Sequence, residues 1–325
     1  MTDLRLVGGQ LLPPASRERR HLLSVLDLTR DDVERILAAA RSFADAQERE
    51  NKKLPTLRGR VVLNVFYEAS TRTSSSFELA AKRLSADTVT LRASGSSVEK
   101  GESLKDTALT LSSYDPDVIV LRHPEAGAAA FVARLTGARV VNAGDGKHQH
   151  PTQALLDLYT LRNAFGRLDG LQVAIVGDVA HSRVARSLVQ ALNLVGSQAL
   201  LVGPPALLPP GVAPVSHDID AIADADVIYV LRMQRERMLE GANFVPSLRE
   251  YSRQYGITAA RVRPGQVVMH PGPINRGVEL SGEVADSEAS LVLAQVRAGL
   301  VVRMAILYDL LTAGPVAVEA TVETA

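Results

Sequence analysis

Short apolar runs alternate along this chain with segments of helical periodicity, and this alternation limits the fold more than any other feature. Strands separated by helices are typical of βαβ units, which build parallel sheets. The expected strands are residues 61–66, 87–91, 117–121, 139–142, 171–176, 198–202, 226–231 and 267–269. The expected helices are residues 29–46, 74–84, 105–113, 127–135, 153–163, 184–195 and 290–311. The sequence therefore predicts an α/β fold with doubly wound, mainly parallel sheets flanked by helices.

The length of the chain indicates two domains. One hydrophobic core rarely serves 325 residues, and the hydrophobic fraction of 46% is enough to fill two cores. Residues 117–122 and 226–232 each run from an aspartate through an apolar strand to an arginine, which favours two similar sheets. We expect residues 1–150 and 151–287 to form the two domains. A C-terminal helix within residues 288–325 is expected to pack back on the first domain.

The charge balance and the absence of cysteine exclude several classes of protein. Lys plus Arg equals Asp plus Glu at 36 each, which argues against a nucleic-acid-binding or membrane-binding surface. Without cysteine, a disulfide scaffold, a thiolate nucleophile and a Cys-ligated metal are impossible. The N-terminus lacks the pattern of a signal peptide, and no apolar run is long enough to span a bilayer. We therefore expect a soluble, cytoplasmic protein with no partner among nucleic acids or membranes.

Candidate ligand-binding residues follow the expected strands. In parallel α/β sheets, ligands bind beyond the carboxyl ends of the strands. Here those positions are rich in hydroxyls, arginines and histidines, and they comprise residues 68–73, 94–102, 122–124, 142–153, 177–183, 232–234 and 270–273.

Ser70-Thr71-Arg72-Thr73 lies between a strand and a helix start. Backbone N–H groups, hydroxyls and one arginine at a helix N-terminus suit a phosphate dianion. The alternative is that the hydroxyls only cap the helix. The segment lacks the G-x-x-x-x-G-K pattern of a nucleotide-binding loop.

Arg122 and His150 are candidates for acyl-transfer chemistry. Arg122 at a strand end suits phosphate or a polarised carbonyl, and the alternative is an ion pair with a surface acid. A neutral His150 suits donation to a carbonyl oxygen that gains charge in a transition state. By residue type alone, a histidine satisfied within its loop is equally compatible. His148 and His150 lack further ligands at zinc spacing, so we predict no metal.

A lysine and two arginines complete the candidate set. Lys100 follows a strand in a Gly- and Ser-rich loop and suits closure over a phosphate, although an ordinary solvated lysine is the alternative. Arg183 and Arg232, the latter with Gln234 beside it, suit bidentate binding of carboxylates. The alternative for Arg232 is an ion pair with Glu236.

These segments together resemble the aspartate and ornithine carbamoyltransferases. Ser70-Thr71-Arg72-Thr73 resembles the phosphate loop of that family, and four further segments resemble it in the same order. They are residues 95–102, residues 121–124, residues 142–153 and residues 181–187. The resemblance spans roughly residues 20–312. It implies transfer of a carbamoyl group from carbamoyl phosphate to an amino acid, without a cofactor.

The resemblance also implies roles for individual residues. The first domain would bind carbamoyl phosphate through Ser70, Thr71, Arg72, Thr73, Ser96, Arg122, His150 and Gln153. The second domain would bind the amino acid through Arg183, Arg232, Gln234, Gly272 and Pro273, with help from Lys100. The catalytic set would be Arg72, Thr73, Lys100, Arg122 and His150. Ser96 and Lys100 would reach the neighbouring subunit's site, which implies a homotrimer with shared active sites.

Two features favour aspartate as the acceptor, and with it the committed step of de novo pyrimidine biosynthesis. Pro271 stands where the ornithine enzymes place a cysteine. A cationic side chain such as that of ornithine would need an acidic residue near Arg232, and Gln234 is not acidic. The aspartate enzymes have Leu-Pro in this stretch, whereas this chain has Gly272 before Pro273. The alternatives are an ornithine-type or other amino-acid carbamoyltransferase, and a catalytically silent binding or assembly subunit. The latter would be expected to lack Arg72, Lys100 or His150. Association with regulatory or dihydroorotase-like subunits stays open.

Overall fold

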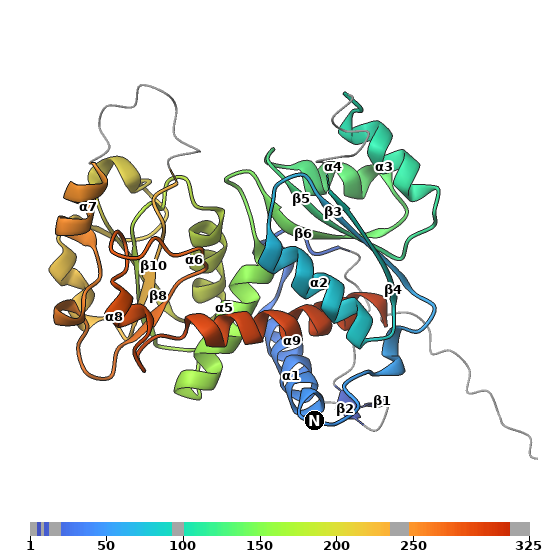
Figure 1. The fold of residues 1–325 in the computed structure, drawn as a ribbon, viewed down its shortest axis with the longest axis horizontal. Coiled ribbons are helices and arrows are strands. Elements are labelled where there is room, and N and C mark those ends of the chain that lie inside the picture. Colours follow the sequence, from blue (N-terminus) through green and yellow to red (C-terminus); the bar gives the residue numbers. More distant parts are fainter. Residues whose placement is uncertain (1–4, 8–9, 13–20, 93–100, 235–246, 313–325) are drawn as a thin grey trace, which may run out of the picture.

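The computed structural model describes residues 5–7, 10–12, 21–92, 101–234 and 247–312 (Figure 1). The strands are β1 (Arg5–Val7), β2 (Gln10–Leu12), β3 (Val61–Phe66), β4 (Asp87–Arg92), β5 (Val118–His123), β6 (Arg139–Asp145), β7 (Gln172–Val176), β8 (Gln198–Val202), β9 (Val215–Ser216), β10 (Val227–Val230) and β11 (Val267–Met269). The α-helices are α1 (Arg30–Gln47), α2 (Thr71–Arg83), α3 (Leu104–Ser112), α4 (Ala128–Leu135), α5 (Pro151–Phe165), α6 (Arg183–Val195), α7 (Leu248–Tyr255), α8 (Gly282–Ala285) and α9 (Val292–Leu311). None of the described helices combines the length and apolar character that crossing a membrane requires.

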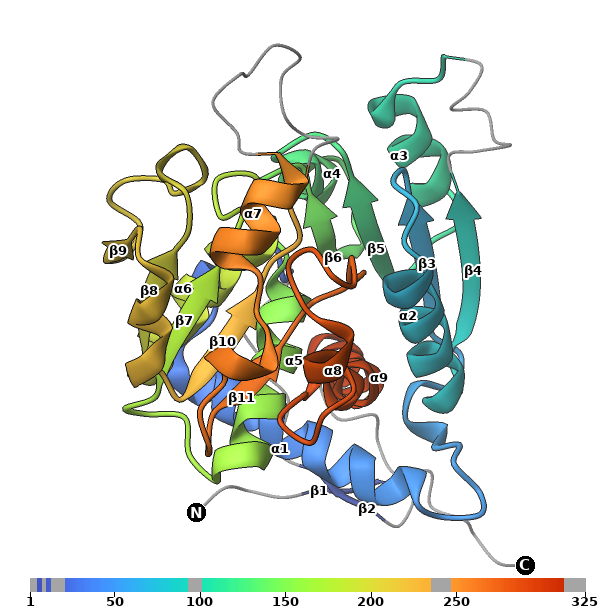
Figure 2. The same ribbon diagram turned by 60° about the vertical axis from the view of Figure 1, so that its left-hand side comes forward.

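Two all-parallel sheets confirm the predicted architecture. The first has the order β4-β3-β5-β6, and the second has the order β11-β10-β7-β8-β9. Each sheet belongs to its own domain and is flanked by helices, and β4 forms the outer edge of the first sheet on the side away from the second domain (Figure 2). A small antiparallel pair, β1 with β2, stands apart from both sheets.

The repeat seen in the sequence corresponds to a repeated structural unit. Asp117 precedes β5, and its carboxylate accepts the backbone N–H of Val61 at the start of β3 at 2.8 Å. Asp226 precedes β10, and its carboxylate accepts the backbone N–H of Gln172 at the start of β7, also at 2.8 Å. Each aspartate therefore aligns the central pair of strands of its sheet. The two sheets are similar, as predicted.

Two helices join the domains. α5 connects the sheets, and every residue from Pro151 to Leu161 is buried. α9 packs against α1, α2 and α5, so the C-terminal helix returns to the first domain as predicted (Figure 1). Because α9 is enclosed by neighbours, most of its residues are buried, including the charged Arg303 and Asp309. Asp309 accepts a hydrogen bond from Arg35 Nε of α1 at 3.0 Å.

Some element boundaries differ from the prediction. α2 begins at Thr71, before the expected residue 74, because the hydroxyl-rich first turn has no apolar periodicity. α7 was not predicted, since its sequence is mostly polar and only Tyr251 and Tyr255 are buried. A capping box at its start, in which the Ser247 and Glu250 side chains bind each other's backbone N–H groups, was the available signal.

The chain order of each sheet determines where a ligand can bind. In the first sheet the chain moves from β4 at the edge to β5 on the other side of β3. In the second it moves from β9 at the edge to β10 on the other side of β7. The loops after such neighbouring strands separate and leave a crevice at their carboxyl ends. The segment at Ser70 follows β3, Arg122 is the second-last residue of β5, Arg183 follows β7 and Arg232 follows β10, so all four lie at or beyond the carboxyl ends of these strands.

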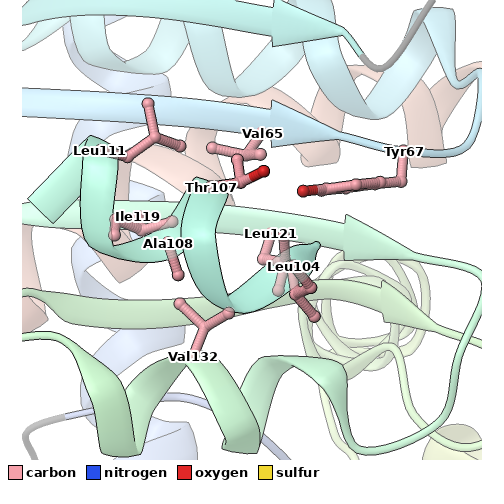
Figure 3. Close-up of a pocket in the computed structure, with 9 residues that line it drawn as sticks. All are labelled: Val65, Tyr67, Leu104, Thr107, Ala108, Leu111, Ile119, Leu121 and Val132. Atoms are coloured by element: carbon pink, nitrogen blue, oxygen red, sulfur yellow. The ribbon is translucent and has the colours of Figure 1, made fainter. Parts of the chain in front are cut away.

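A small apolar cavity in the first domain is distinct from this region. It lies beneath α3 and measures about 10 Å³. Figure 3 shows its lining, in which the hydroxyls of Tyr67 and Thr107 point toward each other. A volume this small is at the limit for one water molecule. We assign it to the packing of the core.

Candidate active site

The hydroxyl of Ser70 is not used to cap α2. Ser70 occupies the N-cap position, but its side chain makes no capping hydrogen bond. Hydroxyls at other helix starts, such as Thr29, Ser103 and Ser182, each accept a backbone N–H. The capping alternative is therefore wrong for Ser70. Its hydroxyl and the first N–H groups of α2 stand together at a helix N-terminus, as an anion site requires.

Arg72 lies against the turn that follows β11 in the other domain. A Cβ atom added to Gly272 would overlap the guanidinium of Arg72, and Gly272 has φ +65°, which favours glycine. The peptide between Gly272 and Pro273 is cis. Partial burial lowers the pKa of Arg72 from its ordinary value. The first turn of α2 and the turn at Gly272 thus meet, although 200 positions separate Arg72 from Gly272 in the chain.

A buried histidine holds this turn. The Nδ1 atom of His270 accepts the N–H of Gly272 at 2.7 Å, and Nε2 faces Glu279 Oε1 at 3.2 Å. Because Nδ1 accepts, the proton of the neutral ring is on Nε2. Burial lowers the pKa of His270, and the positive charges of Arg72 and Arg232 lower it further, against the opposing effect of Glu279. Both arginines, one from each domain, therefore act on the same imidazole.

Glu68 bridges arginines of the two domains. Its Oε2 atom lies 3.2 Å from Arg122 Nε and accepts a hydrogen bond from Arg183 Nη2. Arg183 is only 3% exposed, and its Nη1 atom donates to the carbonyl of Gly146 at 3.2 Å. It also lies over Gly144, where a Cβ atom would come within 2.9 Å of the guanidinium. Arg183 thus extends from α6 of the second domain to the loop after β6 of the first.

The loop before α5 places His150 and Gln153 beside these groups. The carboxylate of Asp145 organises the loop by accepting the backbone N–H groups of Gly127 at 2.7 Å and Gln149 at 3.0 Å. His150 is buried at the N-cap of α5, and its backbone N–H donates to Ser187 Oγ of α6 at 2.8 Å. Gln153 follows in the first turn of α5, also buried.

His148 pairs with Asp145 in the same loop. Its Nδ1 atom lies 3.0 Å from Asp145 Oδ2, and half of the side chain is exposed. Across the described ranges, no group of three or more His, Asp or Glu side chains is arranged to hold a metal ion.

Arg232 and Gln234 follow the end of β10 in the second domain. The backbone N–H of Gln234 donates to Asp178 Oδ2 at 2.9 Å, and Asp178 is fully buried. His181 Nδ1 binds the other carboxylate oxygen at 2.7 Å. Asp178 therefore ties the segment after β10 to the segment after β7, where Arg183 begins α6.

The expected residues of this site fall into two groups. The structure brings the 70–73 segment, Arg122, His150, Gln153, Arg183, Arg232 and the Gly272–Pro273 turn to the facing edges of the two sheets. Ser96, Lys100 and Glu236 lie outside the described residues. No role was predicted for Glu68, Asp178 or Glu279. Their signal was an acid directly after a strand for Glu68 and Asp178, whereas Glu279 had none.

The comparisons with known proteins agree with this arrangement. Residues 20–163 match the family described as "Aspartate/ornithine carbamoyltransferase, carbamoyl-P binding domain", and residues 169–310 match its "Asp/Orn binding domain". The aspartate carbamoyltransferase catalytic subunit of Acidothermus cellulolyticus is 55% identical over 303 residues, covering 91% of this chain and 93% of that protein. The subunit of the same name from Thermobifida fusca is 56% identical over 300 residues, covering 90% and 95%.

Solved structures show the same similarity. Aspartate transcarbamoylase from Trypanosoma cruzi, in complex with carbamoyl aspartate and phosphate, superposes with a TM-score of 0.84 at 33% identity, covering 92% of this chain and 98% of that chain. The same enzyme in complex with N-(phosphonacetyl)-L-aspartic acid gives a TM-score of 0.83 at 32% identity, with coverage of 92% and 98%. The catalytic subunit of M. Jannaschii aspartate transcarbamoylase gives a TM-score of 0.79 at 37% identity, with coverage of 90% and 98%. From the two matched domains, the close relatives and the convergent arginines, we conclude that this chain belongs to the aspartate and ornithine carbamoyltransferase family.

Proposed function

We propose that the enzyme transfers the carbamoyl group of carbamoyl phosphate to the amino group of L-aspartate, giving N-carbamoyl-L-aspartate and phosphate. This is the committed step of de novo pyrimidine biosynthesis. The supporting observation is the convergence of arginines from both domains, with Arg72 against the Gly272 turn and with Arg122 and Arg183 on one carboxylate. A phosphorylated donor beside a dicarboxylate needs such a concentration of positive charge.

The first domain binds carbamoyl phosphate in this proposal. The N-terminus of α2 and the hydroxyl of Ser70 hold the phosphate, with Thr71, Arg72, Thr73 and Arg122. Thr73, Arg122 and His150 face the carbonyl oxygen, and Gln153 accepts the carbamoyl amino group. The free hydroxyl at the N-cap and the buried position of His150 support these roles.

The second domain binds aspartate through Arg183, Arg232, Gln234 and the turn at Gly272 and Pro273. The α-amine attacks the carbonyl carbon and gives a tetrahedral intermediate, whose oxyanion is stabilised by the donors from the first domain. The C–O bond to phosphate then breaks, and a phosphate oxygen takes the proton from the amine. Placement of two bound substrates at attack distance supplies much of the rate. The reaction needs no covalent intermediate with the protein.

We further propose a cytoplasmic homotrimer in which Ser96 and Lys100 complete the site of a neighbouring subunit. Both residues follow β4, the outer strand of the first sheet, which lies on the side away from the second domain (Figure 2). This position favours contact with another subunit over contact with the chain's own crevice. The proposed domains are residues 1–150 with 288–325 for carbamoyl phosphate, and residues 151–287 for aspartate.

An assay of phosphate release tests the reaction. Carbamoyl phosphate is supplied with aspartate, with ornithine or with water alone, and carbamoyl aspartate is measured in parallel. We expect turnover with aspartate only. Arg72→Ala should reduce kcat/KM by at least about a hundredfold, as loss of a charged phosphate contact predicts. Arg58→Ala, at an exposed position outside the site, is the matched control and should keep normal turnover.

Subunit exchange tests the shared site. Trimers inactivated by Lys100→Ala are mixed with trimers inactivated by His150→Ala, and exchange is verified by mass. Hybrid trimers contain some sites with neither substitution, so a fraction of the activity should return. Verified exchange without any recovery would place Lys100 in its own subunit's site.

A further inference from the structure

Asp157 is a fully buried carboxylate at the junction of the two domains, and the proposed mechanism does not use it. It lies on α5, one turn after Gln153. Its Oδ1 atom accepts hydrogen bonds from Gln153 Nε2 at 3.1 Å and from Gln295 Nε2 of α9 at 2.7 Å. Its Oδ2 atom accepts the hydroxyl of Tyr229, from β10 of the second sheet, at 2.7 Å. One side chain thus connects α5, α9 and the second sheet.

Packing alone does not favour a carboxylate at this buried position. Burial raises the pKa of Asp157 to about 7, against the three hydrogen bonds and the charge of Arg303, which favour its ionised form. Arg303 itself donates to Ser76 Oγ at 2.7 Å and to the carbonyl of Gly299 at 3.2 Å. A buried charge held mainly by neutral donors is costly, and apolar residues of similar volume often replace such groups without loss of stability.

The carboxylate determines which end of Gln153 faces the substrate. Oδ1 accepts hydrogen bonds when Asp157 is ionised, and it also accepts when Asp157 is protonated on Oδ2, so the amide of Gln153 directs Nε2 toward Asp157 in both states. Its Oε1 atom is then the end left to accept an N–H. The amino group of carbamoyl phosphate is such a donor, whereas an amide turned the other way would present two N–H groups to it.

The same carboxylate orients a second amide. Gln295 also directs Nε2 toward Asp157, and its Oε1 atom accepts the backbone N–H of His270 at 2.9 Å. His270 in turn accepts the N–H of Gly272 at 2.7 Å. A continuous series of hydrogen bonds therefore runs from Gln153 through Asp157 and Gln295 to the turn that lies against Arg72.

We propose that Asp157 is a positioning residue that fixes both glutamine amides, so that Gln153 Oε1 accepts the carbamoyl amino group and the Gly272 turn stays against Arg72. This proposal rests on the proposed function, because it assigns a purpose to the contact between Gln153 and carbamoyl phosphate. Its specific consequence is that the enzyme discriminates between two phosphorylated donors. The enzyme should prefer carbamoyl phosphate to acetyl phosphate, in which a methyl group replaces the amino group, and Asp157 should be required for that preference.

The test measures dissociation constants for carbamoyl phosphate and acetyl phosphate with the full-length enzyme. Asp157→Val fills a similar volume but offers no acceptor. We expect it to reduce the preference for carbamoyl phosphate about tenfold, the effect of one hydrogen bond, and Gln153→Ala should reduce it equally. The double variant should show no further reduction, because Asp157 acts through Gln153. A merely structural residue would weaken both ligands alike and leave their ratio unchanged.

Two variants serve as controls. Asp157→Asn keeps one oxygen for both glutamines and turns its NH₂ toward the Tyr229 hydroxyl, so it should retain the preference. Tyr229→Phe removes the bond to Oδ2 and leaves both glutamine bonds to Oδ1 in place, so it should retain the preference even if the enzyme unfolds at lower temperature. If the valine variant does not fold, Asp157→Ala replaces it, with the same expected loss, because alanine also offers no acceptor.

The outcomes separate this proposal from the proposed function. A wild-type preference that survives in Asp157→Val or Asp157→Ala overturns the role of Asp157 while leaving carbamoyl transfer intact. A preference that survives in Gln153→Ala overturns the assignment of Gln153 and this proposal with it. A wild-type enzyme that binds carbamoyl phosphate but does not transfer its carbamoyl group to aspartate contradicts the proposed function instead, since the preference can still be measured by binding.

Discussion

Arg72 and Gly272 are in direct contact, although Arg72 is in the first turn of α2 in the first domain and Gly272 follows β11 in the second. The absence of a side chain at position 272 is what makes room for the guanidinium. The same position also has φ +65°, which disfavours residues other than glycine. Glycine at position 272 therefore has a steric consequence for Arg72 at the N-terminus of α2.

Gly272→Ala should raise the KM for carbamoyl phosphate about tenfold or more, because the added Cβ displaces the guanidinium of Arg72. The strained backbone should also cost about 1–2 kcal/mol of stability. Gly277→Ala is the matched control, since Gly277 has φ +81° but nothing within 4 Å of an added Cβ. The control should lose similar stability and keep its KM. Equal KM values in the two variants would refute the role of the contact.

Glu68→Gln should reduce kcat about tenfold. The charge of Glu68 holds Arg122 and the almost fully buried Arg183 in one place, and breaking a buried pair leaves a charge without its partner. Steady-state kinetics measures this loss, and circular dichroism checks the fold. Glu78→Gln removes a surface pair with Lys82 at the outer face of α2 and should leave kcat unchanged. A Glu68 variant with normal kcat would show that the bridge is dispensable.

The titration of Asp157 should influence stability between about pH 4 and pH 7. Its pKa is about 7 in the folded protein, against an ordinary value of 3.8, so the folded state binds the proton more tightly. Its stabilising contribution is therefore complete below about pH 4 and is lost as the pH rises through about 7. Asp157→Asn does not titrate. We measure the urea midpoint of unfolding for the wild type and for this variant. The wild-type midpoint minus the variant midpoint should decrease as the pH rises from 4.5 to 7 and then stay constant. A difference that is independent of pH would contradict the shifted pKa.

The sequence predicted the strands well because apolar runs and their boundaries are local signals. The helix at Thr29 was marked by its own capping box, and α9 by its long apolar period. The alternation of strands and helices also placed Arg122 and Arg232 at the carboxyl ends of their strands without knowledge of their neighbours.

Contacts between distant residues could not be predicted in the same way. Glu68 precedes Arg183 by 115 positions, and only the packing of two domains brings them together. Asp157 stands in an apolar stretch of α5, where a single acid is typical of an exposed face. Asp157 is buried because β10 and α9 cover it, and both are distant from it in the sequence. Whether Ser70 caps α2 also depended on geometry, since the sequence was compatible with both capping and binding, and the structure shows no capping bond.

The central claim is that arginines of both domains form one pocket for a phosphorylated donor and a dicarboxylate. The most direct measurement is the calorimetric binding of N-(phosphonacetyl)-L-aspartic acid, which joins a phosphonate to a dicarboxylate in one molecule. We expect the wild-type enzyme to bind this compound tightly. Arg72→Ala and Arg232→Ala should each weaken its binding by about 10- to 100-fold, whereas Arg58→Ala should have no effect. Unchanged binding in either Arg72→Ala or Arg232→Ala would contradict it, because the two domains would then not share a pocket.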